Sequence, residues 1–94
     1  MTKRSVVHIS KFAEKQIKRL PKFIKEAVNI WAHSVEEDGI RETRKLPGYH
    51  DEPLRGDRKG QRSIRLNKQW RAIYRIINKK IEFVLIEEVT PHDY

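Results

Sequence analysis

The chain has 94 residues, a formal net charge of +8 at pH 7 and no cysteine. This length allows a single domain over residues 1–94, and the absence of cysteine excludes disulfides and thiolate metal sites. The positive charge indicates a polyanionic partner, either a nucleic acid or an acidic protein. Because no stretch has the length of a membrane span or of a signal peptide's apolar core, we expect a cytoplasmic protein without membrane contact.

The first part of the chain has the pattern of one strand followed by two helices. Ser5–Ile9 is rich in β-branched residues and predicts a short strand. Ser10 is a suitable N-cap for an amphipathic helix over Lys11–Leu20. Pro21 suits the first turn of a second, strongly amphipathic helix, and Gly39 suits the left-handed position that ends it.

The middle of the chain lacks a clear period. Three acidic residues, Glu36, Glu37 and Asp38, stand where the dipole of the second helix disfavours negative charge, and we expect them to be exposed. Ile40–Gly60 is densely charged and carries several glycines and prolines. We therefore expect a long, partly irregular connection, of a kind that is usually functional or disordered.

After this connection apolar and polar residues alternate with a period of two, which is typical of strands. We predict three strands in an antiparallel meander, over Gln61–Leu66, Trp70–Ile77 and Ile81–Val89. The order β-α-α-β-β-β predicts an α+β fold, with the two N-terminal helices packed on one face of the sheet.

The strand register follows from keeping the apolar residues on one side. A three-residue turn pairs Leu66 with Trp70, and a two-residue turn pairs Ile77 with Lys80. The face that the helices cover is then predicted to carry Ile64, Ala72, Tyr74, Ile76, Ile81, Phe83 and Leu85.

The opposite face of the predicted sheet is unusually basic. Arg65 lies directly across from Arg71 in this register, and facing like charges lower stability. Arg75 has a predicted partner in Glu82, whereas the other two arginines have none. A bound phosphate would explain the pair, since guanidinium groups match phosphate oxygens in a bidentate way; a solvated, splayed pair is the alternative. This face also carries apolar residues, which predicts that it is partly covered. They are Ile73, Val84 and Ile86.

The C-terminal residues offer the chemistry of RNA cleavage without a metal. Such cleavage needs a base, an acid and cations around the phosphate. His92 is suited to proton transfer, Asp93 to orienting the imidazole or acting as a base, and Tyr94 to exchanging a proton or stacking on a base. Arg71 would supply positive charge. An ordinary frayed polar tail is the alternative for these terminal residues.

Other residues are candidate contacts to RNA or phosphate. His50, in the long connection, is a second candidate for proton transfer or base contact, or else an exposed loop histidine. We expect no metal or cofactor, because the histidines are scattered and no glycine-rich nucleotide loop is present. The candidate RNA- or phosphate-binding residues are Arg65, Arg62, Ser63, Arg75, His50 and Lys59.

Four segments together resemble a known family. They are Leu46–Leu54, Gly60–Asn67, Gln69–Tyr74 and Glu88–Tyr94. Over nearly its full length the chain resembles toxins of the RelE/HigB superfamily, the toxic half of bacterial type II toxin–antitoxin pairs, and most closely the HigB-like branch. The resemblance implies the fold described above and cleavage of mRNA without a metal, typically in the ribosomal decoding site, with contacts to rRNA. It also implies neutralisation by a cognate antitoxin protein.

The same resemblance suggests roles for particular residues. Arg71 matches the strand arginine that contacts the scissile phosphate in the family, and Arg65 matches a position where relatives carry a basic residue. His92–Tyr94 matches the terminal motif of the HigB type. Ser63 departs from the RelE type, which carries a lysine at that position, so the assignment of roles there is open.

Two other functions are compatible with the residues. ParE-like relatives share the fold and poison DNA gyrase by binding it, a function with no physical need for Arg71 or the terminal His92. A basic nucleic-acid-binding module without catalysis is the other alternative, and it would show strongly salt-dependent RNA affinity without cleavage.

Overall fold

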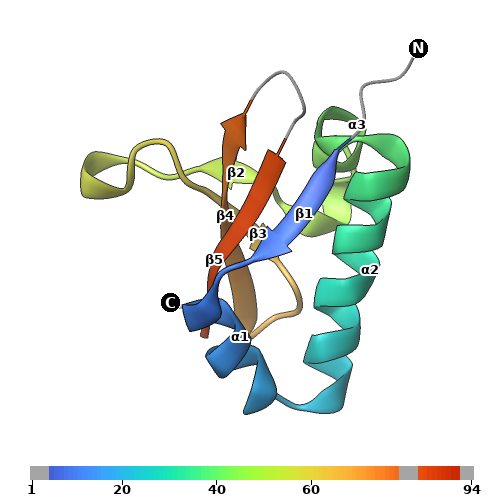
Figure 1. Ribbon diagram of the computed structural model, residues 1–94, viewed down its shortest axis with the longest axis vertical. Coiled ribbons are helices and arrows are strands. Elements are labelled where there is room, and N and C mark those ends of the chain that lie inside the picture. The colour runs from blue at the N-terminus through green and yellow to red at the C-terminus, as the bar shows by residue number, and fades with distance from the viewer. Residues whose placement is uncertain (1–4, 79–82, 92–94) are drawn as a thin grey trace.

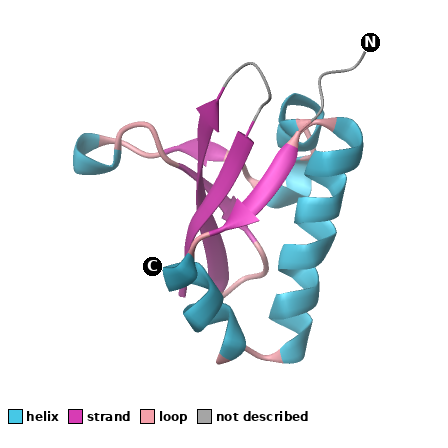
Figure 2. Cartoon of the chain, in the orientation of Figure 1, coloured by secondary structure: helices cyan, strands magenta, loops and turns pink. Residues whose placement is uncertain are grey.

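The computed structural model describes residues 5–78 and 83–91 of the chain. It is an α+β fold in which the helices lie against one side of a five-stranded sheet (Figures 1 and 2). The helices are α1 (Lys11–Lys18), α2 (Lys22–Asp38) and α3 (Ile40–Arg44), with single 3-10 turns η1 (Pro47–Tyr49) and η2 (Gly56–Arg58). The strands are β1 (Val6–Ile9), β2 (Glu52–Pro53), β3 (Arg62–Arg65), β4 (Trp70–Asn78) and β5 (Phe83–Pro91).

The sheet is mixed, with the strand order β1-β5-β4-β3-β2. The predicted meander of β3, β4 and β5 is confirmed, and its neighbours pair antiparallel. β1 lies parallel to β5 at one edge of the sheet, and the two-residue β2 forms the other edge. No helix in the described ranges has the length and apolar character needed to cross a bilayer.

The residues predicted to start and end the helices lie at the helix ends, although Pro21 is the N-cap of α2 and stands just before its first turn. Ser10 caps α1, because its side-chain oxygen accepts a hydrogen bond from the backbone N–H of Ala13 at 3.0 Å. Gly39 ends α2 with a φ of 87°, a conformation that favours glycine. Glu36 has a role that the sequence did not predict, since its carboxylate accepts a hydrogen bond from the N–H of Val7 at 3.3 Å. This contact satisfies one outward-facing donor of the edge strand β1.

The connection predicted as irregular begins as a helix. Ile40 and Thr43 of α3 are almost fully buried, and the hydroxyl of Thr43 donates a hydrogen bond to the carbonyl of Gly39 at 3.0 Å. Five residues make little more than one helical turn, so no period was available to predict this helix. The prediction of a partly irregular connection is compatible with this, but the sequence did not locate α3 at its start.

The hydrophobic core lies between the helices and the inner face of the sheet. At its centre the rings of Trp31 and Tyr74 lie 5.0 Å apart between centroids and are tilted by 48°. Further buried residues of this core are Ala13, Leu20, Ile24, Val28, Val35, Ile40, Ile64, Ala72, Ile86 and Val89.

The predicted register is correct for one hairpin and wrong for the other. Ile64 pairs with Ala72, and Arg65 pairs with Arg71, as predicted. Between β4 and β5, however, Tyr74 pairs with Ile86, whereas the predicted two-residue turn would place it opposite Phe83, so the predicted register is wrong. The predicted pair of Ile77 with Lys80 itself includes a residue outside the described part. The run of apolar residues that opens β5 has no alternation, and alternation is what fixes a register. Residues 79–82, including Glu82, and the side chains at 83–85 lie outside the described part.

A β-bulge at Glu87 explains the remaining departure. Tyr74 pairs with Ile86 whereas Ile73 pairs with Glu88, so Glu87 is an extra residue in β5. The bulge lets both Ile86 and Val89 reach the core, although they are three residues apart. The prediction that Ile86 lies on the opposite face was therefore wrong. Ile73 is fully buried on that opposite face, which confirms that the face is partly covered.

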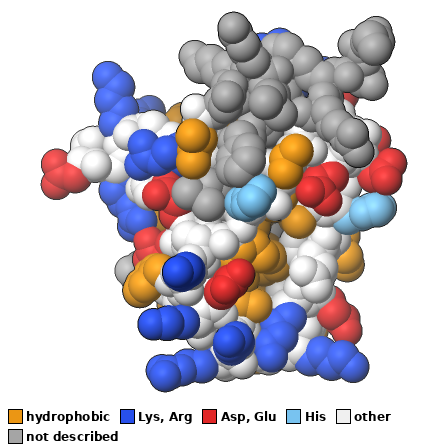
Figure 3. Space-filling model, in the orientation of Figure 1, with side chains coloured by type: hydrophobic (Ala, Val, Ile, Leu, Met, Phe, Trp, Pro, Cys, Tyr) orange, Lys and Arg blue, Asp and Glu red, His pale blue; other side chains and the backbone are white. Residues whose placement is uncertain are grey.

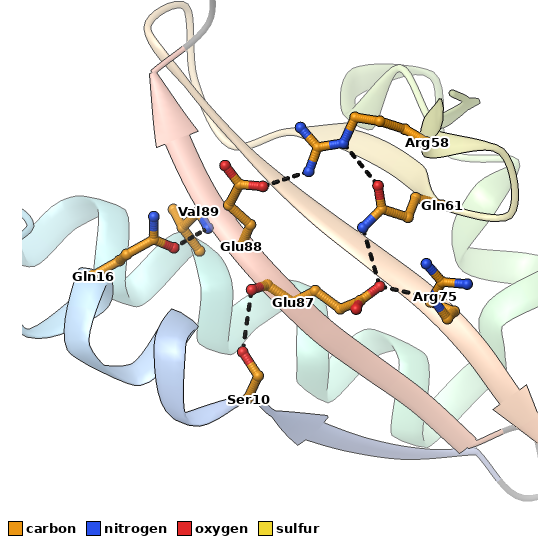
Figure 4. A network of polar contacts seen from close by, with 8 residues as sticks. All are labelled: Ser10, Gln16, Arg58, Gln61, Arg75, Glu87, Glu88 and Val89. Atoms are coloured by element: carbon orange, nitrogen blue, oxygen red, sulfur yellow. Dashed lines mark hydrogen bonds and ion pairs between the residues drawn. The ribbon is translucent and has the colours of Figure 1, made fainter. Parts of the chain in front are cut away.

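The bulge also anchors a polar network that holds η2 against the sheet (Figure 4). Glu87 accepts hydrogen bonds from Arg75 Nε at 2.9 Å and from Gln61 Nε2 at 3.2 Å. Arg58 of η2 donates to the side chains of Gln61 and Glu88, at 2.8 and 2.5 Å. The acidic partner of Arg75 is thus Glu87. Burial opposes ionisation of Glu87, but the bonds from Arg75 and Gln61 hold its pKa below the ordinary value.

Replacing Glu87 with glutamine is expected to lower the free energy of unfolding at neutral pH by at most about 1 kcal/mol, because Arg75 is partly exposed. The folded pKa of Glu87 lies below its unfolded value of about 4.3, so its ionised form stabilises the fold above that pH. The difference from wild type should shrink as the pH falls through the folded pKa. Urea unfolding over this pH range measures the stability difference between wild type and Glu87→Gln, and Glu26→Gln is the exposed control. A difference that does not depend on pH would show that the ionised form of Glu87 does not stabilise the fold.

Candidate functional site

A small pocket lies where β2, β3 and β4 meet. Its polar and aromatic lining comes from segments that are distant in the sequence, brought together by the strand pairing described above. The residues that line it are His50, Glu52, Ser63, Arg65, Trp70 and Arg71.

Two arginines give the pocket its charge. Arg65 and Arg71 face each other across the β3–β4 pair, and among the described residues neither takes part in an ion pair. Nε of Arg71 is buried and has no hydrogen-bond partner in the described part of the chain. Facing like charges destabilise a sheet by several tenths of a kcal/mol, and a buried donor without a partner adds to that cost. An anion in the pocket would relieve both effects, and phosphate has the oxygen geometry that guanidinium groups match.

An imidazole and a carboxylate stand beside this pair. His50 follows η1 in a left-handed conformation with a φ of 46°, which is uncommon for a residue other than glycine. Glu52 lies in β2, where it pairs with Ser63. The sequence predicted His50 and Ser63 as candidates but missed Glu52. Glu52 lies in a two-residue strand inside a segment without a period, so it gave no usable signal.

Asp51, between these two residues, is turned to the other side and fixed there. Its side chain is only 1% exposed, and its two oxygens accept hydrogen bonds from Arg62 Nε at 2.6 Å and from the hydroxyl of Tyr74 at 2.5 Å. Side chains alternate along an extended segment, so anchoring Asp51 inward presents Glu52 to the pocket, while His50 lines it from the left-handed position just before Asp51. We call this set of Asp51, Arg62 and Tyr74 the Asp51 clamp.

The electrostatics of the Asp51 clamp are consistent with a fixed structural role. Burial, and then the hydrogen bond to Asp51, raise the pKa of Tyr74 far above its ordinary value, so the phenol stays protonated and donates. Burial works against the charge of Arg62, but the hydrogen bond and the negative charge of Asp51 raise its pKa. The pKa shifts of Tyr74 and Arg62 therefore keep both groups protonated, as donors to Asp51.

The structure separates the predicted site residues into groups. It brings His50, Ser63, Arg65 and Arg71 together in the pocket. Arg62 does not join them, since it is bound to Asp51 on the other face of the sheet. Two further predicted residues lie elsewhere, since Arg75 is bound to Glu87 and Lys59 is exposed after η2. His92, Asp93 and Tyr94 are outside the described residues.

The end of β5 runs beside the pocket. Thr90 pairs with Arg71, and Pro91, the last described residue, pairs with Trp70. The strand that leads to the terminal His-Asp-Tyr sequence therefore ends opposite two pocket-lining residues. Trp70 is a further residue that the site prediction missed; an aromatic residue directly before a strand arginine was the available signal.

Together these groups can bind an anion and transfer protons. Two guanidinium groups, one imidazole and one carboxylate line a single pocket. No group of three histidine, cysteine, aspartate or glutamate side chains suited to a metal ion occurs among the described residues. The arrangement fits a phosphate ester as the bound group, with acid and base groups placed around it.

Solved structures with this fold cover nearly the whole chain. The toxin–antitoxin complex RelBE2 from Mycobacterium tuberculosis has 25% identity and a TM-score of 0.68, covering 93% of this chain and 96% of that one. The DinJ–YafQ complex from E. coli has 20% identity and a TM-score of 0.72, covering 97% and 94%. The archaeal RelE–RelB complex from Pyrococcus horikoshii has 24% identity and a TM-score of 0.67, covering 97% and 96%. No protein-family model matches the sequence, and no curated protein is significantly similar to it.

These similarities confirm the RelE-like fold that the sequence motifs implied, and with it the resemblance to the RelE superfamily. The matched structures include RelE, YafQ and YoeB proteins. They do not single out the HigB-like branch.

Replacing Asp51 with asparagine is expected to lower the free energy of unfolding by about 3 kcal/mol, because Arg62 would be left as a largely buried charge without its partner. Tyr74→Phe keeps that ion pair and should lower it by only about 1 kcal/mol. Urea unfolding checks that Asp51→Asn loses more stability than Tyr74→Phe. The exposed Asp57→Asn is the control, and its free energy of unfolding should lie within about 0.5 kcal/mol of wild type. Equal effects of Asp51→Asn and Asp57→Asn would show that the Asp51 clamp does not stabilise the fold.

Proposed function

We propose that this protein is the toxin of a type II toxin–antitoxin pair and that it cleaves mRNA as a metal-independent endoribonuclease. The observation that carries the proposal is the facing pair of Arg65 and Arg71, set without acidic partners among the described residues in a pocket beside His50 and Glu52. The RelE-like fold supports it, because solved proteins with this fold are toxins of toxin–antitoxin complexes.

The proposed reaction is an attack of the ribose 2′-hydroxyl on the adjacent phosphorus. A base takes the proton of the 2′-hydroxyl while its oxygen forms a bond to phosphorus. The bond from phosphorus to the 5′-oxygen breaks, and an acid protonates that oxygen, which leaves a 2′,3′-cyclic phosphate and a 5′-hydroxyl. The guanidinium groups of Arg65 and Arg71 would stabilise the negative charge that builds up on the phosphate oxygens.

The proton-transfer groups come from two segments in this proposal. Glu52 is a carboxylate at the pocket and suits the base; His50 is the imidazole there. For His92, predicted from the sequence as a proton-transfer group, we propose the role of the acid, with Asp93 and Tyr94 as its supporting groups. The pairing of Pro91 with Trp70 supports this assignment, because it leads the chain to the pocket immediately before His92.

The proposed partners follow from the same function. The substrate would be mRNA on the ribosome, with additional contacts to rRNA, and the activity would lie in the cytoplasm. A cognate antitoxin would neutralise it, as expected from solved RelE-like toxins that form complexes with RelB, DinJ and YefM. A gyrase-binding toxin of the same fold gives no reason for an arginine pair that faces an imidazole and a carboxylate.

Arg71→Ala and His92→Ala are each expected to abolish growth inhibition and lower the cleavage rate by about a hundredfold or more, since each removes charge stabilisation or proton transfer. Arg71→Lys keeps the positive charge but cannot form the bidentate hydrogen bonds of a guanidinium group, so it should retain intermediate activity. Induced expression followed by mapping of RNA 5′ ends checks this, with the exposed Arg19→Ala as the control. Gyrase-dependent DNA breaks without new RNA ends would overturn the proposal in favour of a gyrase poison.

Glu52→Gln is expected to lower kcat by about a hundredfold while KM for RNA stays near the wild-type value, because the change removes a base without removing positive charge. Steady-state cleavage of RNA on purified ribosomes measures both constants. His50→Ala, assayed in parallel, reports whether the second pocket group also transfers a proton. A Glu52→Gln protein with unchanged kcat would remove this carboxylate from the mechanism.

A further inference from the structure

A second concentration of positive charge lies beside the sheet, apart from the candidate pocket. It is a groove lined by the end of α3 and by one residue of β3: Arg41, Arg44, Lys45 and Arg62. Because side chains alternate along β3, Arg62 points away from the face that Ser63 and Arg65 share. We call this feature the basic groove.

The groove keeps a net positive charge after its own ion pairs are counted. Lys45 contacts Glu42 at 3.1 Å, but both side chains are more than 60% exposed, and such pairs are weak. Arg62 is held by Asp51, which is buried. Among the described residues Arg41 and Arg44 are in no ion pair. Cations gathered in a concave surface raise the local potential and attract polyanions.

Stabilisation of α3 does not explain this arrangement. Basic residues at the end of a helix interact favourably with its dipole, and Arg41, Arg44 and Lys45 are placed to do so. However, α3 is only five residues long, and Arg62 comes from a strand and has no part in that effect. The groove combines both segments into one surface.

We propose that the basic groove binds the phosphate backbone of RNA at a place separate from the pocket where cleavage is proposed. The choice of RNA as the polyanion rests on the proposed function. Arg62 and Arg65 are three residues apart on β3, or about 10 Å along the strand, and point to opposite faces. The neighbouring edge strand β2 is only two residues long. An RNA chain bound at the pocket therefore has a short path around this edge to the groove.

Another basic surface on the molecule provides a matched control. Lys and Arg side chains gather over α1 and the start of α2 at the lower edge of the view in Figure 3. Lys15 and Lys18 of α1 are both exposed. Replacing both with glutamate changes the net charge as much as replacing Arg41 and Arg44, but away from the groove.

The test measures binding to an RNA oligonucleotide with 2′-O-methyl riboses, which has no nucleophile and is not cleaved. Fluorescence anisotropy over a range of salt concentrations gives the slope of log Kobs against log salt for wild type, Arg41→Glu/Arg44→Glu and Lys15→Glu/Lys18→Glu. We expect the groove variant to bind about tenfold or more weakly and to lose about 0.7 in slope for each phosphate contact removed. The α1 variant should keep the wild-type slope.

Equal effects of the two variants, or no effect of the groove variant, would overturn the proposal. So would a groove variant that keeps its RNA affinity but no longer binds a coexpressed antitoxin, since the groove would then serve a protein partner. Thermal unfolding checks that the variants fold, and Arg41→Gln/Arg44→Gln replaces the charge-reversed pair if that pair is unstable. A wild-type protein that cleaves no RNA but shows the groove-dependent slope would overturn the cleavage proposal alone.

Discussion

The candidate site depends on one buried carboxylate. Asp51 receives hydrogen bonds from Arg62 and Tyr74, and this fixes the segment that joins η1 to β2. Tyr74 packs in turn against Trp31 at the centre of the core. The pocket is therefore connected to the centre of the hydrophobic core through the hydrogen bond from Tyr74 to Asp51, although His50 and Glu52 themselves come from a short, irregular segment. Proton transfer needs groups held in place, and this connection supplies that order.

The arginines on and beside the sheet form two groups, those bound to a carboxylate and those without a carboxylate partner among the described residues. Arg58, Arg62 and Arg75 are bound to carboxylates: the first two connect η2 and the Asp51 segment to the sheet, and Arg75 joins β4 to β5. Arg65 and Arg71, by contrast, face each other without such a partner among the described residues. The distinction is physical, because a guanidinium group already bound to a carboxylate has fewer donors to offer a phosphate. Positive charge alone therefore does not distinguish arginines that could bind a phosphate from arginines that hold the fold together.

The proposed pocket and the basic groove place two kinds of contact on neighbouring surfaces. A pocket that combines cations with acid and base groups suits a reacting phosphate, whereas a groove with cations alone suits backbone phosphates that are only bound. Both surfaces depend on β3, whose alternating side chains supply Ser63 and Arg65 to one face and Arg62 to the other.

Sequence alone determined the α+β order, the Ser10 cap, the turn at Gly39 and the opposition of Arg65 and Arg71, because each follows from local backbone preferences or from a short hairpin. Only the tertiary structure decided the position of β1, the bulge at Glu87 and the presence of Glu52 at the pocket. The parallel contact of β1 with β5 joins distant segments, and a bulge changes alternation without a composition signal. Likewise, nothing in the local sequence distinguishes Arg62 from Arg65. Their partners differ because Arg62 is bound by Asp51, eleven residues away in the chain, which in turn accepts a hydrogen bond from the buried Tyr74.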